Sequence, residues 1–409
     1  MEIQYVTATR FKLNTFKDIL ENKRADKSKI TTALLTNNQQ PAWASTLQSL
    51  CDDIPSIDTL FMNGQNAFSD YPMDVVDLGS IERLPHLERL SVYGVNQVKL
   101  GQHTTLKSMK LHVGTSCTRS DLGLTRFVSL TELSLKNHFV SSIGPDQLPI
   151  SLTLLTIRLN KTPPRDSFRS LKSLVKLKII LRRQGDSETT AIIDLEHLPN
   201  LETFKLTDYL MGRKCGIEIR VPPSIKIVAI PSNGVQIQSQ CVMPLLETLD
   251  VHGDVLIDGG VSLKSSPFLK KLVIHGCVNS IPANIMPSTV EKVTVYCYAK
   301  GVDIFKNVVF PPSLTHLTVS GECSVFRLDE VINHTNVRDF SISFTTTPTY
   351  QFSIQRLDKD NKNVLVLEKQ TMTGGIITQR LKSTNNQQQQ DDQQKTQYRP
   401  IYLHFCPLL

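Results

Sequence analysis

The most constraining feature of this 409-residue chain is a spacing of apolar residues that recurs thirteen times. Each copy has an apolar residue, two variable residues, a second apolar residue, one variable residue and a third apolar residue. The triplets are Ile57-Leu60-Met62, Leu87-Leu90-Val92, Leu106-Met109-Leu111, Leu130-Leu133-Leu135, Leu152-Leu155-Ile157, Leu174-Leu177-Ile179, Leu201-Phe204-Leu206, Ile225-Val228-Ile230, Leu246-Leu249-Val251, Leu269-Leu272-Ile274, Val290-Val293-Val295, Leu314-Leu317-Val319 and Val337-Phe340-Ile342. Because one copy cannot bury its own apolar side, the pattern predicts stacked repeats.

The spacing also predicts what each repeat looks like. The second and third apolar residues flank one variable residue, which is the alternation of a β-strand. Successive copies begin 19 to 30 residues apart, a period typical of leucine-rich repeats. We therefore predict an irregular leucine-rich-repeat solenoid of the α/β or mostly β class. Its concave face is a parallel sheet on which the variable residues point outward.

Proline and glycine predict how each strand begins and ends. Proline precedes several strands, where it disfavours a helix and predicts a turn-like convex connection. The clearest cases are residues 149–152, 222–225, 287–290 and 311–314. Glycine recurs two residues after the third apolar position, at Gly94, Gly253, Gly276 and Gly321. Glycine there predicts a tight turn out of the strand.

The two ends of the chain depart from the repeat. Residues 1–50 read as an N-terminal cap, with helices over 11–25 and 42–51 and an atypical strand over 30–35. The repeats then occupy 51–348. Residues 349–409 form a β extension with strands over 351–357 and 363–368, a turn between them, and a third short strand from 374. The Gln-rich stretch 383–397 is expected to be a disordered loop. A last strand over 398–405 is expected to dock on the open end of the final repeat.

Composition limits the class of protein. Apolar residues make up 40% of the chain and charged residues 20%, as in an ordinary soluble protein. No stretch approaches the roughly 18 apolar residues of a membrane span, and no secretory signal is recognised. The eight cysteines are scattered, without the clusters that close extracellular repeats. These features predict reduced thiols and a cytoplasmic location, with the nucleus left open.

Short segments carry a family resemblance. The segment Pro311 to Val319, Pro-Pro-Ser-Leu-Thr-His-Leu-Thr-Val, resembles the FNIP-type (IP22) repeats of social amoebae, which are related to leucine-rich repeats. Residues 363–370, 373–379 and 400–405 resemble the tail that often closes such proteins. The family's Phe-Asn-x-Pro element is replaced by Phe305-Lys-Asn-Val. The resemblance implies an interaction scaffold and carries no catalytic residues to this chain.

Positive charge is concentrated in one segment. The formal net charge of the chain is +7. Residues 158–183 hold nine Lys or Arg and one Asp, so their net charge is 9 − 1 = +8 and the rest of the chain carries 7 − 8 = −1. A local charge of one sign implies a local partner of the opposite sign.

Basic residues also recur at outward positions of the predicted strands. The candidates for partner binding are Lys110, Lys136, Arg158, Lys176, Lys178 and Lys205. Only Glu132 opposes them at equivalent positions of the same strands. The pattern is compatible with a binding surface for an acidic partner. The simpler interpretation is a solvated face that keeps the protein soluble.

Other kinds of site have weaker support. Nucleic-acid binding by residues 158–183 is unlikely, because Phe168 is the only aromatic residue there that could stack on a base. His252 and His275, near Asp250, Asp254 and Cys277, could share a metal, but a surface turn explains them equally simply. No catalytic or cofactor-binding motif is found, so no enzyme and no cofactor are expected.

The sequence thus predicts a non-catalytic scaffold that binds another protein, with an acidic surface, on its concave face. One alternative is a substrate-recognition adaptor in ubiquitin ligation, which would need a recruiting module within residues 1–50. Another is a polyanion or membrane-surface binder that uses the basic segment 158–183, which steep salt dependence would reveal. The identity of the partner and the oligomeric state are left open.

Overall fold

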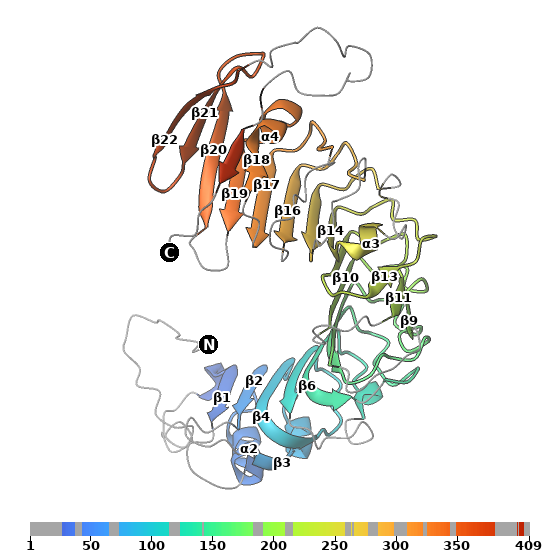
Figure 1. The fold of residues 1–409 in the computed structure, drawn as a ribbon. Coiled ribbons are helices and arrows are strands. Elements are labelled where there is room, and N and C mark those ends of the chain that lie inside the picture. Colours follow the sequence, from blue (N-terminus) through green and yellow to red (C-terminus); the bar gives the residue numbers. More distant parts are fainter. Residues whose placement is uncertain are drawn as a thin grey trace. The chain divides into compact units, whose positions relative to one another are not determined.

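The computed structural model describes residues 27–36, 43–64, 73–113, 123–140, 143–182, 191–208, 216–257, 263, 266–276, 285–297, 309–321, 325–343, 349–380, 399 and 401–404. The predicted helix over 11–25 and the Gln-rich loop 383–397 lie outside these residues. The chain forms two compact units, Met1–Gln184 (unit 1) and Gly185–Leu409 (unit 2) (Figure 1). The boundary falls inside the predicted repeat region, so a single solenoid domain over 51–348 stays a prediction.

Unit 1 is built on a parallel sheet. Its elements are η1 (Lys27–Lys29), β1 (Thr32–Thr36), α2 (Trp43–Asp53), β2 (Thr59–Asn63), β3 (Met73–Asp77), η2 (Gly79–Arg83), β4 (Arg89–Lys99), β5 (Ser108–Val113), η4 (Leu124–Arg126), β6 (Glu132–Val140), β7 (Leu154–Leu159) and β8 (Lys176–Leu181). Strands β1, β2, β4, β5, β6, β7 and β8 pair in that order, all parallel. Strand β3 pairs with the second half of β4. The expected first strand and the helix that follows it are confirmed as β1 and α2.

Unit 2 continues the same type of repeat. Its elements are β9 (Ala191–Asp194), β10 (Thr203–Asp208), β11 (Ile217–Arg220), β12 (Ile227–Ile230), β13 (Val235–Ile237), β14 (Thr248–His252), α3 (Asp254–Ile257), β15 (Lys271–His275), β16 (Lys292–Cys297), β17 (His316–Gly321), β18 (Val325–Arg327), α4 (Leu328–His334), β19 (Asp339–Ser343), β20 (Tyr350–Arg356), β21 (Asn363–Glu368), β22 (Gly374–Thr378) and β23 (Tyr402–His404). Strands β10, β12, β14, β15, β16, β17 and β19 form its parallel repeat sheet. Strands β20, β21 and β22 extend that sheet in antiparallel fashion.

The apolar triplets make the core of both units. None of their residues is more than 3% exposed. In every repeat the second and third apolar residues lie on a strand of a repeat sheet, and the residue between them points the other way. The predicted architecture, a mostly β solenoid with a parallel sheet, is therefore confirmed.

A shared backbone carbonyl marks the start of most of these strands. The carbonyl oxygen of Asp58 accepts hydrogen bonds from the N–H groups of both Glu88 and Arg89, at 2.8 and 2.9 Å. The carbonyl of Glu88 accepts in the same way from Lys107 and Ser108. The arrangement recurs at the carbonyls of Thr31, Lys107, Thr131 and Thr153 in unit 1, and at those of Glu202, Lys226, Glu247, Lys270, Glu291 and Thr315 in unit 2. Each shared carbonyl fixes the register of one repeat on the previous one.

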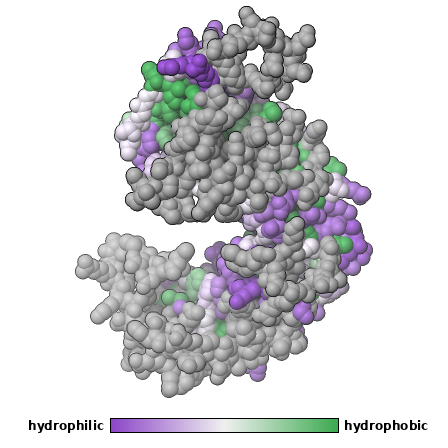
Figure 2. Space-filling view, viewed as in Figure 1, coloured by the Kyte–Doolittle hydropathy of each residue, from purple (hydrophilic) through white to green (hydrophobic). Residues whose placement is uncertain are grey.

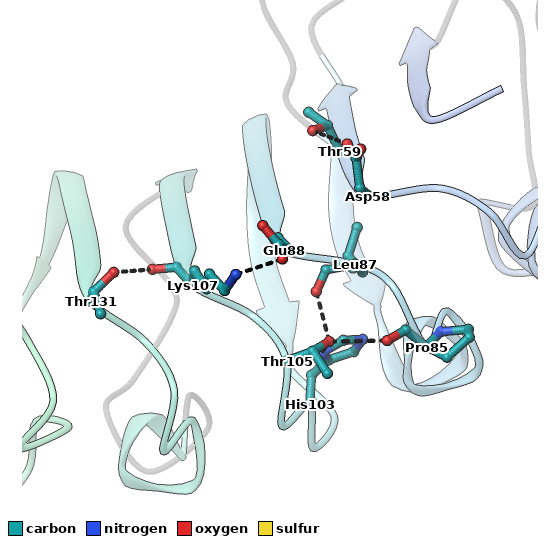
Figure 3. Close-up of polar contacts among 9 residues, drawn as sticks. All are labelled: Asp58, Thr59, Pro85, Leu87, Glu88, His103, Thr105, Lys107 and Thr131. Carbon is teal, nitrogen blue, oxygen red and sulfur yellow. Dashed lines mark hydrogen bonds and ion pairs between the residues drawn. The ribbon is translucent and has the colours of Figure 1, made fainter. Parts of the chain in front are cut away.

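Side-chain hydroxyls add a second link between repeats. In several repeats the Ser or Thr that precedes the triplet donates its hydroxyl to the carbonyl of the first triplet residue in the previous repeat. Figure 3 shows this bond from Thr105 to Leu87, at 2.9 Å, beside the ion pair between Lys107 and Glu88. Equivalent bonds run from Ser151 to Leu130, Ser224 to Leu201, Thr289 to Leu269 and Ser313 to Val290. The serine of the Pro-Pro-Ser segments therefore stabilises the stacking, a role that the sequence pattern did not reveal.

The connections between strands follow the proline pattern. The N–H of Leu314 donates to the carbonyl of Pro311, and Ile225 donates to Pro222 in the same way, which closes tight turns. Gly276 directly follows β15 and Gly321 ends β17, and both adopt positive φ. Gly94 also has positive φ, but it lies within β4, which continues to Lys99 through a local irregularity, so the turn predicted at Gly94 was wrong. At Gly321 an added Cβ would collide with the carbonyl of Cys297, so glycine is required there. Turn-like connections are confirmed at the two Pro-Pro-Ser segments.

Two strand pairings differ from expectation. Strands β9, β11 and β13 form a separate parallel sheet in unit 2 that the triplets did not predict. Strand β23 pairs with β18, an element within the repeats, and not with the end of the final repeat. The prediction for residues 398–405 was wrong because β20 already pairs with β19 and occupies that edge. The predicted strands of the extension are confirmed as β20, β21 and β22.

One arginine joins the extension to the last repeat. Arg356 at the end of β20 donates from Nε and Nη2 to the carbonyl of Ile332, at 3.2 and 3.0 Å, and from Nη1 to that of Val337, at 3.0 Å. It also donates to the carbonyl of Thr335. Ile332 lies in the last turn of α4, whose carbonyls have no partner within the helix. Burial lowers the pKa of Arg356, with a smaller contribution from Arg338.

We expect Ser313→Ala to destabilise unit 2. The change removes the 2.7 Å hydrogen bond to the Val290 carbonyl and should lower the free energy of unfolding by about 1–2 kcal/mol. Urea unfolding followed by circular dichroism measures this. Ser288→Ala, at an exposed serine in the preceding repeat, is the matched control and should have almost no effect. Equal effects of the two changes would contradict the proposed role of the hydroxyl.

We also expect Arg356→Lys to destabilise the extension. A single ammonium group cannot replace the planar fork that reaches the carbonyls of Val331, Ile332, Thr335 and Val337. The free energy of unfolding should therefore fall by about 2–3 kcal/mol. Thermal unfolding of this variant beside Gln355→Lys, at an exposed neighbour on the opposite face of β20, separates the loss of the fork from any effect of a new lysine on this strand. A Tm unchanged by Arg356→Lys would show that the fork is dispensable.

Candidate functional site

The register of unit 1 aligns outward side chains in columns across the sheet. Paired residues of consecutive strands form one such column, which runs through Leu34, Phe61, Ser91, Lys110, Ser134, Thr156 and Lys178. The column is apolar at β1 and β2 and basic at β5 and β8. Lys110 and Lys178 are three strands apart, about 14 Å at the usual spacing. We call Lys110, Lys136, Arg158, Lys176 and Lys178 the basic face.

Lys110 on the basic face has a close acidic partner. Its Nζ lies 3.1 Å from Oε1 of Glu132 on the next strand. Glu132 also accepts a 2.7 Å hydrogen bond from Ser108. Burial raises the pKa of Glu132, but the hydrogen bonds from Ser108 and Lys110 and the charges of Lys110 and Arg89 outweigh it and hold the pKa below its usual value. Lys110 therefore contributes less available charge than the sequence suggested.

The three other lysines of the basic face present their charge to solvent. Lys136 on β6 and Lys176 and Lys178 on β8 are exposed, and Arg158 on β7 is half-buried. These residues lie on three consecutive strands, so the structure brings together four of the six predicted cations without a described acid between them. Lys205 is exposed on β10 in unit 2, where it pairs with Ala229. It is a separate candidate.

Several neighbours on this surface were missed by the charge pattern. Leu34 is 55% exposed, although it is a large apolar side chain, and Phe61 beside it is half-buried. Tyr93 and His112 pair in register, with ring centroids 4.6 Å apart. Burial lowers the pKa of His112, and the nearby positive charge of Lys136 lowers it further. An unusual exposed leucine within the first strand was the available signal for this apolar end.

The basic segment 158–183 does not form one continuous surface. Arg158, Lys176 and Lys178 project from strands, whereas exposed Lys161, Arg165, Arg169 and Lys172 lie on the connection between β7 and β8. Phe168 is only 2% exposed, so it is unable to stack on a base. The single aromatic residue that nucleic-acid binding would have used belongs to the core.

The candidate metal cluster in unit 2 is engaged in other contacts. His252 and His275 are register partners on β14 and β15. His275 Nε2 lies 2.8 Å from Asp250 Oδ1, and its ring stacks on Tyr296 with centroids 4.5 Å apart. Burial lowers the pKa of His252, with Asp254 raising it and His275 lowering it. Within the described residues no group of three His, Cys, Asp or Glu could hold a metal; Cys277 lies outside them.

The described cysteines are free thiols. They are Cys51, Cys241 and Cys297. Burial raises the pKa of Cys51 to about 11, the charge of Arg83 lowers it and that of Asp52 raises it. Such a thiol is almost entirely protonated near neutral pH and reacts slowly. In the described part of the chain no helix is long and apolar enough to cross a membrane.

Comparison with solved structures finds other repeat proteins that this chain resembles. One is CroV588, described as a circular leucine-rich-repeat protein. The match covers 78% of this chain and 54% of the CroV588 chain, with 15% sequence identity and a TM-score of 0.41. The solenoid architecture of this chain itself rests on its buried triplets and parallel strand pairings. No protein-family profile and no curated protein sequence matches the chain.

Two further structures are similar at lower TM-scores. TLR13, solved in complex with the RNA ssRNA13, matches 77% of this chain and 53% of its own, with 13% identity and a TM-score of 0.36. The other is the functional domain of InlJ from Listeria monocytogenes, described as including a cysteine ladder. The match covers 86% of this chain and 90% of the InlJ domain, with 11% sequence identity and a TM-score of 0.25. This chain thus spans about half the length of CroV588 and TLR13.

We expect Lys136→Gln to raise the pKa of His112. Removing the ammonium group relieves repulsion of the imidazolium, while the size of the side chain is nearly kept. Because the His112 pKa lies below its unfolded value of about 6.5, this group favours folding above that pH and the contribution is lost as pH falls. NMR titration of the imidazole measures the pKa. Lys161→Gln, at an exposed lysine on the connection, should leave it unchanged; an unmoved pKa in Lys136→Gln would contradict the described proximity.

Proposed function

We propose that this protein is a non-catalytic interaction scaffold that binds an acidic segment of a partner protein on the basic face of unit 1. The observation that supports this most directly is the exposure of Lys136, Lys176 and Lys178 on nearby strands of one sheet. Solvated faces normally mix charges of both signs. At the described outward positions of β5, β6, β7 and β8 the only acid is Glu132, and it is paired with Lys110.

The sheet favours binding because it is formed before the partner arrives. The strands that carry the basic face are held by shared backbone carbonyls and by hydroxyl bonds between repeats. Their side chains therefore need little further ordering, which keeps the entropic cost of association low. Charges at an exposed surface mainly accelerate and orient the encounter, so affinity should come from many small contacts.

The apolar end of the same surface favours a protein over a simple polyanion. Leu34 and Phe61 share the column of Lys110 and Lys178. A polypeptide can place apolar residues at one end of this column and carboxylates at the other. A simple polyanion has no apolar group that could pack against Leu34. The partner expected from this arrangement is a segment that combines apolar and acidic side chains.

The alternatives remain testable. A substrate-recognition adaptor in ubiquitin ligation would still require a recruiting module in residues 1–50. A polyanion or membrane-surface binder would need the cations of 158–183 to act together, and their division between strands and connection weakens that reading. The FNIP-type subfamily, inferred from residues 311–319 and the tail, and the cytoplasmic location stay predictions.

The test uses charge reversal on the basic face. The variant Lys136→Glu, Arg158→Glu, Lys176→Glu, Lys178→Glu should lose the partner captured from lysate by the tagged wild type and identified by mass spectrometry. With the purified partner its affinity should fall about 10- to 100-fold or more, since each exposed pair contributes about 0.2–1 kcal/mol and reversal adds repulsion. Circular dichroism establishes that the variant is folded.

The matched control reverses the same number of charges on the connection, as Lys161→Glu, Arg165→Glu, Arg169→Glu, Lys172→Glu. It should retain the partner. Equal loss in both variants would indicate general electrostatic attraction by the whole segment. Binding of wild type to heparin or to phosphatidylserine vesicles, with no protein partner, would support the polyanion or membrane alternative and overturn the proposal.

A further inference from the structure

The antiparallel extension of unit 2 ends in an open strand edge. Strand β22 pairs with β21, and among the described residues no strand pairs with its other side. Figure 1 shows β22 at the outer end of the C-terminal strands. An open edge presents N–H and C=O groups that can pair with another chain. This surface is separate from the basic face and does not depend on the proposed function.

The hydrogen-bond pattern shows which groups face the open side. Glu368 N–H donates to the Thr373 carbonyl, and Gln379 N–H donates to the Lys362 carbonyl. In an antiparallel pair alternate residues bond to the same neighbour, so residues 373, 375, 377 and 379 bond toward β21. The N–H and C=O groups of Gly374, Ile376 and Thr378 consequently point to the open edge.

The exposed edge is apolar and uncharged. Ile376 is 61% exposed and Met372, in the preceding turn, is 69% exposed. Ile376 pairs with Leu365 on β21, which places both side chains on the same face. Figure 2 shows hydrophobic residues gathered over this part of the extension. Strand β22, Gly-Gly-Ile-Ile-Thr, has no lysine or proline, the residues that commonly protect an edge from pairing.

We propose that β22 pairs with β22 of a second copy of this chain, antiparallel and about a two-fold axis at Ile376. Ile376 is the middle one of the three residues whose backbone groups point outward. It would therefore pair with Ile376 of the second copy, while Gly374 pairs with Thr378 of the second copy. All three pairs then exchange both backbone hydrogen bonds. The two extensions become one continuous antiparallel sheet.

The side chains favour a second copy over an unrelated strand. The two-fold axis places Ile376 beside Ile376 of the second copy, with Leu365 outside each, so four apolar side chains form one row across the joined sheet. Cross-strand apolar pairs of this kind stabilise sheets. Strand β22 has no charged residue, so two copies of it can pair without electrostatic repulsion between them. Self-complementarity about an axis is what a two-fold dimer requires.

Sedimentation velocity on the full chain tests the association. Because the paired edge is small, we expect a weak dimer with a Kd on the order of 10 to 100 µM. Ile376→Pro removes an outward N–H without removing a bond to β21, and edge strands tolerate proline in that position. It should be monomeric. Ile376→Lys places two ammonium groups at the axis and should be monomeric as well, which keeps the test valid should the proline variant misfold.

Cysteine cross-linking tests the register. In the proposed pairing the Cα atoms of position 376 are about 5.5 Å apart, within the range for a disulfide. Ile376→Cys should therefore form a cross-linked dimer under mild oxidation, well above the background of wild type. Gly375→Cys is the matched control, since its side chain projects into open space from the opposite face and has no counterpart at 375. It should cross-link no more than wild type.

Three results would overturn the proposal. They are a wild type that stays monomeric at concentrations well above the expected Kd, a dimer that persists in Ile376→Lys, and equal cross-linking at positions 375 and 376. The second would place the dimer interface elsewhere on the molecule. The third would indicate random collision of exposed thiols.

Discussion

The carbonyl shared between successive repeats is the constraint on which the rest of the structure depends. A single oxygen, such as that of Glu88, accepts from two consecutive N–H groups of the next repeat. Consecutive donors leave no freedom to slide one strand along another, and a slip of one residue would move every apolar side chain to the solvent face. The irregular lengths of the connections, 19 to 30 residues from one triplet to the next, are tolerated because register is set where the strand begins and not by the loop.

Side chains at the same positions strengthen this constraint. The residues with shared carbonyls alternate in charge through Glu202, Lys226, Glu247, Lys270 and Glu291 in unit 2, and Lys226 lies 2.8 Å from Glu202. Each such exposed pair contributes little stability. The alternation nevertheless opposes a shifted stacking, because skipping one repeat would place like charges together. The basic face is a consequence of the same register, since Lys178 and Lys110 share a column only when all the intervening strands are correctly aligned.

Sequence predicted the parts of this fold that follow from burial. The triplets are visible because every member must be apolar, and all of them are in the core. The strands β9, β11 and β13 were missed because three or four residues such as Val235–Ile237 are too short to show a period. The role of Arg356 depends on carbonyls about 20 residues away, which no local pattern encodes. The candidate cations were found, but the 3.1 Å contact that occupies Lys110 follows from neighbouring repeats and not from the charge count. The apolar end at Leu34 was missed because a charge pattern carries no information on exposed apolar side chains.

The C-terminal extension shows how a repeat sheet can end without another repeat. A parallel strand such as β19 leaves one row of backbone groups without a following repeat, and the antiparallel strand β20 satisfies them directly. Each strand added after β20 pairs with one open edge of the sheet and creates a new one, so the unpaired backbone groups move to the last strand. Charge, proline or closure would normally end such a series, and β22 has none of these on its five residues. Capping the solenoid with antiparallel strands therefore transfers the open edge from the repeats to a short apolar strand, where pairing with an identical strand is the geometrically simplest way to satisfy it.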